Sequence, residues 1–202
     1  MLSSCKEESN SILFPESQPK NIEALASFPK SLQGMYYCKE DNSELKITSN
    51  LLIQKYTNDF KVEELGDDVE FSGDTLIDKK TGERLFLKRL NDSIIEKIIS
   101  FDTIFRISDD QIVKKMNGNY ILNSYRESGE GWVISILNKK NENLYLSFMD
   151  SLAESSIAKI TKQKVDTIIP RYYNPSKAQF RKFLKSDAHQ YKKEFIRVEY
   201  VW

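Results

Sequence analysis

The sequence predicts a mainly β fold, in which antiparallel meanders in two similar halves form a sandwich or a partly open barrel. First, short apolar segments alternate with polar residues along most of the chain, as half-buried strands do. Second, Asn, Asp, Gly and Ser separate these segments at short intervals, as hairpin turns do. Third, similar strand openings at Gly34 and Gly118 predict an internal repeat, with halves of about 28–110 and 111–202.

In the first half, the pattern predicts a three-stranded meander followed by short hairpins. The segment 93–107 is rich in Ile and Phe. Because β-branched side chains fit extended backbone well, we expect two strands there and no helix. The strands expected in this half are 32–38, 45–48, 51–56, 60–62, 69–71, 75–77, 84–87, 94–100 and 103–108, with a hairpin tip at 79–82.

In the second half, the sequence predicts a central strand and two helices. Residues 132–137 are apolar on both faces, which is typical of a covered strand. A capping-box pattern at Ser151 predicts a short helix to about residue 160. Ser176, followed by Gln179 and an apolar face, predicts the C-terminal helix. Further strands are expected at 111–114, running on into 116–122, and at 144–148, 165–173 and 193–202.

The charge distribution argues against a nucleic-acid partner. The chain holds 30 basic and 30 acidic residues, so no net field draws it to a polyanion. The balance is uneven locally, because residues 1–83 hold 9 basic and 16 acidic side chains, whereas residues 159–197 hold 11 basic and 3 acidic. These are either solvated faces or, for the basic region, a surface for an acidic protein partner.

The first residues contain a candidate targeting signal. Leu2-Ser3-Ser4-Cys5 resembles the lipobox of bacterial lipoproteins. Lys6, Glu7 and Glu8 follow it and are similar to the export signal of surface lipoproteins in the Bacteroidetes. The resemblance implies a small surface lipoprotein of undefined role, anchored in the outer membrane by acyl groups on Cys5. The alternative is a cytoplasmic protein with an incidental cysteine.

The expected organisation is a tether followed by a domain. Residues 1–20 are polar and contain Pro15 and Pro19, so they predict a flexible tether that carries the lipid-attachment cysteine. Residues 21–202 are expected to form one mainly β domain, which the two halves would share. Only one further cysteine is present, Cys38. On a predicted strand, such a thiol is expected to be a buried, small apolar group.

Catalytic, metal-binding and cofactor-binding motifs are missing from the sequence. His189 is the only histidine and lies in a polar, charged segment, and the acidic residues of 59–78 lack the spacing of a calcium loop. We therefore expect a non-catalytic envelope lipoprotein with a binding or structural role and no cofactor. The alternatives are a soluble intracellular protein that neutralises a toxin by binding it, or a hydrolase whose carboxylates meet in space.

Overall fold

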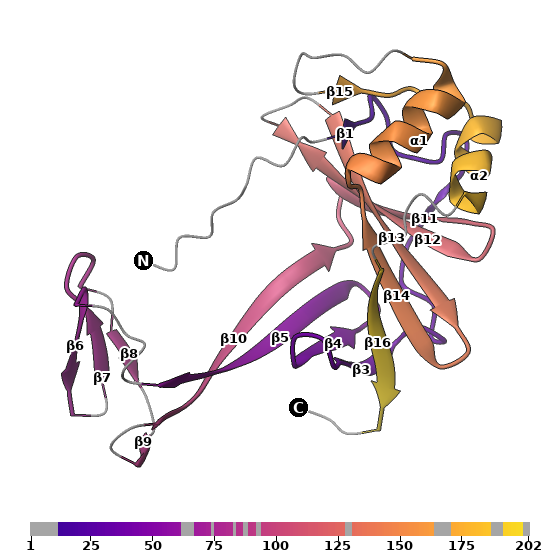
Figure 1. The fold of residues 1–202 in the computed structure, drawn as a ribbon. Helices are drawn as coiled ribbons and strands as arrows, with labels where there is room; N and C mark the ends of the chain where they lie inside the picture. Colours follow the sequence, from indigo (N-terminus) through magenta and orange to yellow (C-terminus); the bar gives the residue numbers. More distant parts are fainter. Residues whose placement is uncertain are drawn as a thin grey trace. The chain divides into compact units, whose positions relative to one another are not determined.

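The computed structural model describes residues 12–61, 67–73, 75–82, 84–86, 89–91, 94–127, 131–163, 171–186 and 192–199 (Figure 1). The chain forms two compact units. The first, here called the hairpin unit, comprises Lys55–Asp102, and the second, here called the main unit, comprises Lys6–Gln54 and Thr103–Trp202. The division therefore differs from the expected boundary at 110/111, because the hairpin unit lies within the first predicted half.

One antiparallel sheet forms most of the main unit, with its strands in the order β2-β11-β12-β13-β14-β16-β3-β4-β5-β10-β9. The sheet curls into a half-barrel, which confirms the predicted mainly β class. Strands β5 and β10 continue from this unit into the hairpin unit. The bounds are β1 Ile12–Leu13, β2 Ala24–Leu25, β3 Gly34–Cys38, β4 Ser43–Ile47, β5 Leu51–Lys61, β9 Arg89–Asn91, β10 Ile94–Arg106, β11 Gln111–Met116, β12 Asn119–Arg126, β13 Gly131–Lys140, β14 Asn143–Phe148, β15 Arg171–Tyr172 and β16 Lys192–Val198.

The hairpin unit contains a small sheet made of β6 (Val69–Ser72), β7 (Thr75–Asp78) and β8 (Arg84–Phe86). The predicted hairpin tip is confirmed. The Asp78 carboxylate accepts hydrogen bonds from the backbone N–H groups of Lys80 and Thr81, both at 2.8 Å, and Gly82 has a φ of 73°. These bonds close the turn, and a left-handed φ is one that glycine adopts without a Cβ clash.

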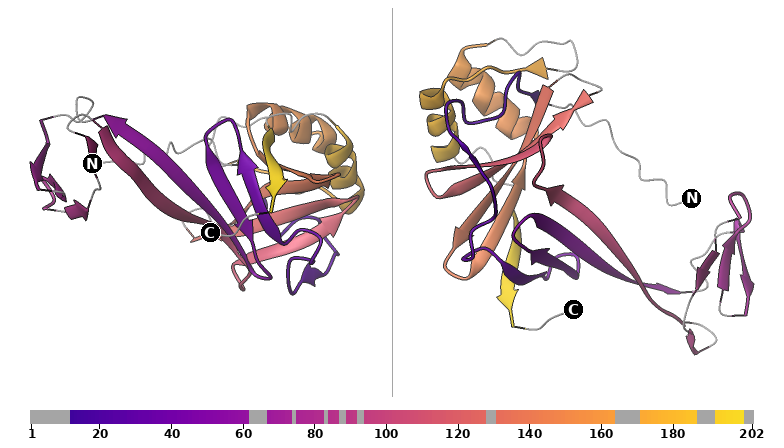
Figure 2. Two further views of the ribbon diagram at one scale, coloured as in Figure 1. Left: turned by 90° about the horizontal axis from the view of Figure 1, so that it is seen from below. Right: turned by 180° about the vertical axis from the view of Figure 1, so that it is seen from behind.

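The two predicted helices lie against one face of the sheet (Figures 1 and 2). Helix α1 spans Ser151–Thr161 and helix α2 spans Lys177–Lys185. The capping box of α2 is as predicted, because the Ser176 hydroxyl accepts from the backbone N–H of Gln179 and the Gln179 side chain accepts from the backbone N–H of Ser176. In α1 the capping residue is Asp150, one position before the expected Ser151.

Two apolar clusters pack on opposite faces of the sheet. The inner cluster fills the concave face and includes Tyr36, Cys38 and Phe195, each fully buried. Cys38 is a free thiol whose pKa is raised by burial, as expected for a small apolar core group. The helix-side cluster joins Ile121 and Ile136 to the apolar faces of α1 and α2. Both faces of the central strands are therefore covered.

The two Gly-x-Tyr sequences have different structures, and the expectation that 111–114 runs on into 116–122 is wrong, because a turn separates β11 from β12. Gly34 lies in β3 with a φ of 144°. Gly118 lies in the two-residue turn between β11 and β12, where Asn117 and Gly118 have φ values of 51° and 79°. Positive φ at both positions is the requirement of a type I′ hairpin, which Asn-Gly favours. Another difference is that β10 is one strand, not two.

Residues 12–20 pack into the main unit and do not belong to a tether, which corrects that expectation. We call them the N-terminal strap. Its apolar residues Leu13 and Phe14 are 1% and 0% exposed. The Lys114 ammonium group donates to the carbonyl oxygens of Ser17 and Pro19, at 2.9 and 3.1 Å. Burial of these apolar side chains stabilises the packing of the strap.

Strand β16 lies between the two meanders and pairs with β14 on one side and β3 on the other. The guanidinium group of Arg197 lies over the Tyr36 ring, 5.5 Å from its centroid, and donates to the Tyr36 hydroxyl at 3.1 Å. A Cβ atom at Gly34 would lie 2.9 Å from the Arg197 Nη2 atom. The glycine therefore leaves room for the arginine that crosses from the last strand to the first meander.

Candidate functional site

The candidate site is a pocket of about 230 Å³ between the helix-facing side of the sheet and the C-terminal end of α2. Its lining is mostly polar although the helix-side apolar cluster adjoins it. The volume is below the roughly 300–1,000 Å³ that is usual for drug-sized ligands. The pocket therefore suits a small group. The lining residues are Asn119, Ile136, Asn138, Ser147, Leu184, Lys185, Ser186 and Lys192.

The floor of the pocket is formed by neighbouring positions on four strands. Ile136 of β13 lies opposite Ser147 of β14, and Ser147 lies opposite Lys192 of β16. Two positions along β13, Asn138 lies opposite Asn119 of β12, and the Asn138 amide donates to the Asn119 side-chain oxygen at 3.0 Å. Because side chains on a strand alternate between faces, this pairing places all five on the helix-facing side.

The wall above the floor comes from the end of α2. Phe183 and Leu184 bury the apolar face of the helix, and this orientation turns Lys185 and Ser186 toward the pocket. The Ser186 backbone N–H donates to the carbonyl oxygens of Lys182 and Phe183, at 3.2 and 3.0 Å, and so caps the last turn. The helix end is thereby fixed, which holds the two lining residues in place.

The pocket carries positive charge. No ion pair within the described parts of the chain involves Lys185 or Lys192, and both are exposed. Glu194, two residues after Lys192 on β16, does not line the pocket and accepts hydrogen bonds from Tyr145 at 2.7 Å and Asn143 at 2.8 Å. The bond from Tyr145 is the main reason that the pKa of Glu194 is lowered. Glu194 is thus engaged away from the lining, where the two ammonium groups remain.

The groups that line the pocket are hydrogen-bond donors and cations, with two apolar side chains. Among the described residues that line the pocket, none has a carboxylate, an imidazole or a thiol. Two ammonium groups beside two amides and two hydroxyls can hold the oxygen atoms of a carboxylate or a phosphate, because charge-assisted hydrogen bonds to such anions are strong. The arrangement therefore fits binding of a small anionic group.

A second polar cluster lies at the inner face of the sheet. The Gln54 amide donates to the Ser43 hydroxyl at 2.6 Å, and that hydroxyl donates to Asp41 at 2.6 Å. Asp41 also forms an ion pair with Lys193. Burial opposes ionisation of Asp41, but the hydrogen bonds from Lys193 and Ser43 outweigh it, so its pKa is lowered. Each buried group has a partner here, and we assign the cluster to stability.

The predicted site residues are placed as follows. Cys5, Lys6, Glu7 and Glu8 lie outside the described residues, as does His189. Within the described part of the acidic stretch, as elsewhere in the described chain, no three His, Cys, Asp or Glu side chains gather in a way that could hold a metal ion. The described basic residues of the C-terminal region are distributed over α1, β15, α2 and β16.

Sequence reasoning missed the floor of the pocket. Asn119 and Ser147 are 9% and 2% exposed, so they are polar residues in covered strands. Ser147 stands between Leu146 and Phe148. A polar side chain within such an apolar run indicates a polar site in a covered strand. Only the strand pairing shows that Ser147 and Asn119 contribute to the same pocket.

Comparisons with known proteins give no relative for this chain. No protein-family model, no curated protein and no solved structure matches it. Among the described residues, neither helix has the length and apolar character that crossing a bilayer requires.

Proposed function

We propose that this chain is a non-catalytic binding protein of the bacterial envelope, anchored to the outer membrane through Cys5, and that it holds a small anionic group in the pocket beside α2. The observation that supports binding is the pocket itself, in which Lys185 and Lys192 stand over a polar floor. The observation that supports localisation to the outer membrane is the sequence around Cys5. The two parts of the proposal are tested separately.

The outer surface of α2 supports an anionic ligand. Lys177, Arg181, Lys182 and Lys185 are exposed, and the helix contains no acidic residue. Cations near a helix C-terminus also interact favourably with its dipole, so part of this charge stabilises α2 itself. Lys185 differs from Lys182 because it lines the pocket. That difference provides a matched control.

The double variant Lys185→Gln/Lys192→Gln is expected to bind anions about tenfold more weakly or worse, because a hydrogen bond to a charged group contributes roughly 1.5–3 kcal/mol. The measurement is isothermal titration calorimetry with inorganic phosphate and with glucuronate. The two probes distinguish a phosphate from a sugar carboxylate as the preferred source of the anion. Binding should also weaken as salt is raised.

The matched control is Lys159→Gln/Lys182→Gln, which removes the same charge from exposed positions that do not line the pocket. It should change the affinity less than about twofold, as expected for solvated surface charges. Equal losses in both double variants would show that the basic surface acts as a whole, as for an acidic protein partner, and would contradict the pocket. So would the absence of heat with either probe.

Lipid attachment is expected to depend on Cys5 alone. When the native gene is expressed in a bacterium fed labelled palmitate, the protein should carry the label, and Cys5→Ser should lose it completely. Cys38→Ser is the control and should keep the label, because its thiol is fully buried. Separately, replacing Lys6, Glu7 and Glu8 by alanine should retain the label but reduce digestion by protease added to intact cells. A protein that carries no label dependent on Cys5 would refute the envelope assignment.

A further inference from the structure

Three aromatic side chains gather where the strap enters the main unit. Tyr125 of β12 and Trp132 of β13 pack edge to face with ring centroids 5.4 Å apart. Tyr172 of β15 lies close to Gly131, the residue before Trp132. A Cβ atom built on Gly131 would lie 3.4 Å from the Cε1 atom of the Tyr172 ring. Tyr125 and Tyr172 are 38% and 44% exposed, and Trp132 is partly exposed. We call these three residues the aromatic rim.

Backbone pairing fixes the rim to the start of the strap. Leu13 pairs with Tyr172 in a parallel ladder. Phe14 and Trp132 exchange two backbone hydrogen bonds, from the Phe14 N–H at 2.9 Å and from the Trp132 N–H at 2.8 Å. The first described residue, Ile12, therefore lies beside the rim.

The segment between Cys5 and Ile12 is short. Six residues, 6–11, separate Cys5 from Ile12. Even fully extended, the seven steps between these two Cα atoms span at most about 25 Å. An acyl-anchored Cys5 would thus hold Ile12, and the rim beside it, close to the bilayer. Tyrosine and tryptophan side chains are enriched at the boundary between lipid and water, because each ring combines an apolar body with a polar tip.

We infer that the aromatic rim is a membrane-contact surface, which inserts Tyr125, Trp132 and Tyr172 into the lipid–water interface of the bilayer that holds the anchor. This inference rests on the proposed function, since the anchor supplies the proximity. The contact would fix the orientation of the main unit on the membrane. Three rings are too few for firm attachment without the anchor, so the rim acts as a second, weaker contact.

The test supplies the tether artificially, so that it does not depend on lipidation. The full chain carries an N-terminal hexahistidine tag and the substitutions Cys5→Ser and Trp202→Phe, which leave Trp132 as the only tryptophan. It is attached to vesicles of phosphatidylethanolamine and phosphatidylglycerol that contain a nickel-chelating lipid. We expect the Trp132 emission to shift to shorter wavelength and to fall about twofold when the acyl chains are brominated, as for a ring at the interface.

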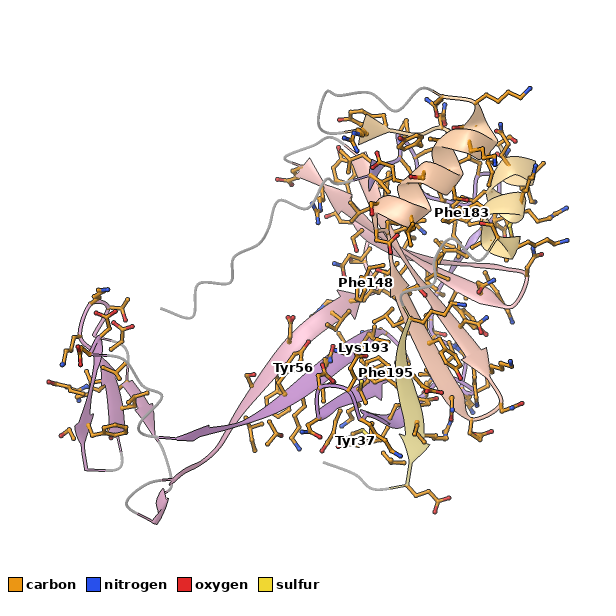
Figure 3. All side chains as sticks on the ribbon, in the orientation of Figure 1. Tyr37, Tyr56, Phe148, Phe183, Lys193 and Phe195 are labelled. Atoms are coloured by element: carbon orange, nitrogen blue, oxygen red, sulfur yellow. The ribbon has the colours of Figure 1, made fainter. Side chains whose placement is uncertain are left out.

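The matched variants separate the rim from a partly exposed aromatic residue elsewhere in the main unit. Tyr125→Ser/Tyr172→Ser should lose most of the quenching, whereas Tyr37→Ser should keep it. Tyr37 is a suitable control because Figure 3 places it on β3, away from β15 within the same unit. Each variant is first shown to be folded by its near-ultraviolet circular dichroism.

The outcomes separate this inference from the proposed function. Quenching in the tethered parent supports the rim even if the native protein carries no palmitate. Equal Trp132 emission on brominated and ordinary vesicles, with the protein attached, overturns the inference and leaves the lipid anchor at Cys5 untouched. Equal quenching in all variants also overturns it, because the contact would then not depend on the rim.

Discussion

Replacing Arg171 by methionine is expected to lower the free energy of unfolding by about 3 kcal/mol. Arg171 of β15 donates to the Glu154 carboxylate of α1 at 2.6 Å, and Tyr173 donates to the other carboxylate oxygen at 3.1 Å. Glu154 is only 6% exposed. Removing the arginine would leave a buried carboxylate without its cation, and an unpaired buried charge costs more than the pair itself contributes.

Urea unfolding, followed by far-ultraviolet circular dichroism, measures this loss. The double variant Glu154→Gln/Arg171→Met should be more stable than Arg171→Met alone, because it removes the charge that was left unpaired. A loss below about 1 kcal/mol in Arg171→Met would contradict the argument, since that is the range of an exposed ion pair.

The same cluster predicts how stability depends on alkaline pH. Burial, together with the nearby charge of Glu154, raises the pKa of Tyr173 from 10.0 to about 12. The folded state therefore keeps a proton that the unfolded state loses above its own pKa. The ionisation of Tyr173 therefore leaves the free energy of unfolding unchanged below about pH 10. Above that pH the free energy of unfolding falls by up to about 1.4 kcal/mol per pH unit, until the pKa of Tyr173 in the folded state is passed. A Tyr173→Phe variant should show a shallower decline, and the part that remains belongs to other groups whose pKa burial raises, such as Tyr36 and Cys38.

Replacing Phe195 by alanine is expected to cost about 3–5 kcal/mol of stability. Phe195 is fully buried in the inner apolar cluster, and it lies on β16, the strand that connects the two meanders (Figure 3). The substitution would leave a cavity at the place where β14 and β3 are joined through β16. We therefore expect a less cooperative transition as well as a lower midpoint in urea.

Two variants serve as controls for this prediction. Phe195→Leu keeps most of the volume and should cost roughly 1.5 kcal/mol or less. Phe148→Ala removes the same side chain from β14, where it is 44% exposed, and should cost clearly less than Phe195→Ala. Similar losses in Phe195→Ala and Phe148→Ala would contradict a central role for β16.

Much of the local structure could be predicted from the sequence. The cap of α2 at Ser176 and the hairpin tip at 79–82 depend on neighbouring residues, so their patterns are local and were interpreted correctly. The turn at Asn117-Gly118 was equally local, and its Asn-Gly signal predicts a two-residue hairpin. The likeness of the two Gly-x-Tyr sequences is therefore misleading, because Asn117 before Gly118 favours a hairpin turn and Gln33 before Gly34 does not.

Long-range features could not be predicted in this way. The place of β16 between β14 and β3 depends on pairing partners far away in the chain, and alternation along one strand does not identify them. The strap contains prolines and polar residues, which are typical of a tether, yet Phe14 and Gln18 are fully buried. For the pocket, the sequence shows the excess of basic residues in 159–197. It does not show that Asn119, Asn138 and Ser147 meet, because only strand pairing brings them together.

The position of β16 in the chain has a consequence for biosynthesis. Its residues 192–198 emerge from the ribosome after both meanders have been made, and yet they separate those meanders in the finished sheet. The two meanders can be joined only once β16 has been synthesised, so the sheet of the main unit cannot be completed before that strand is available.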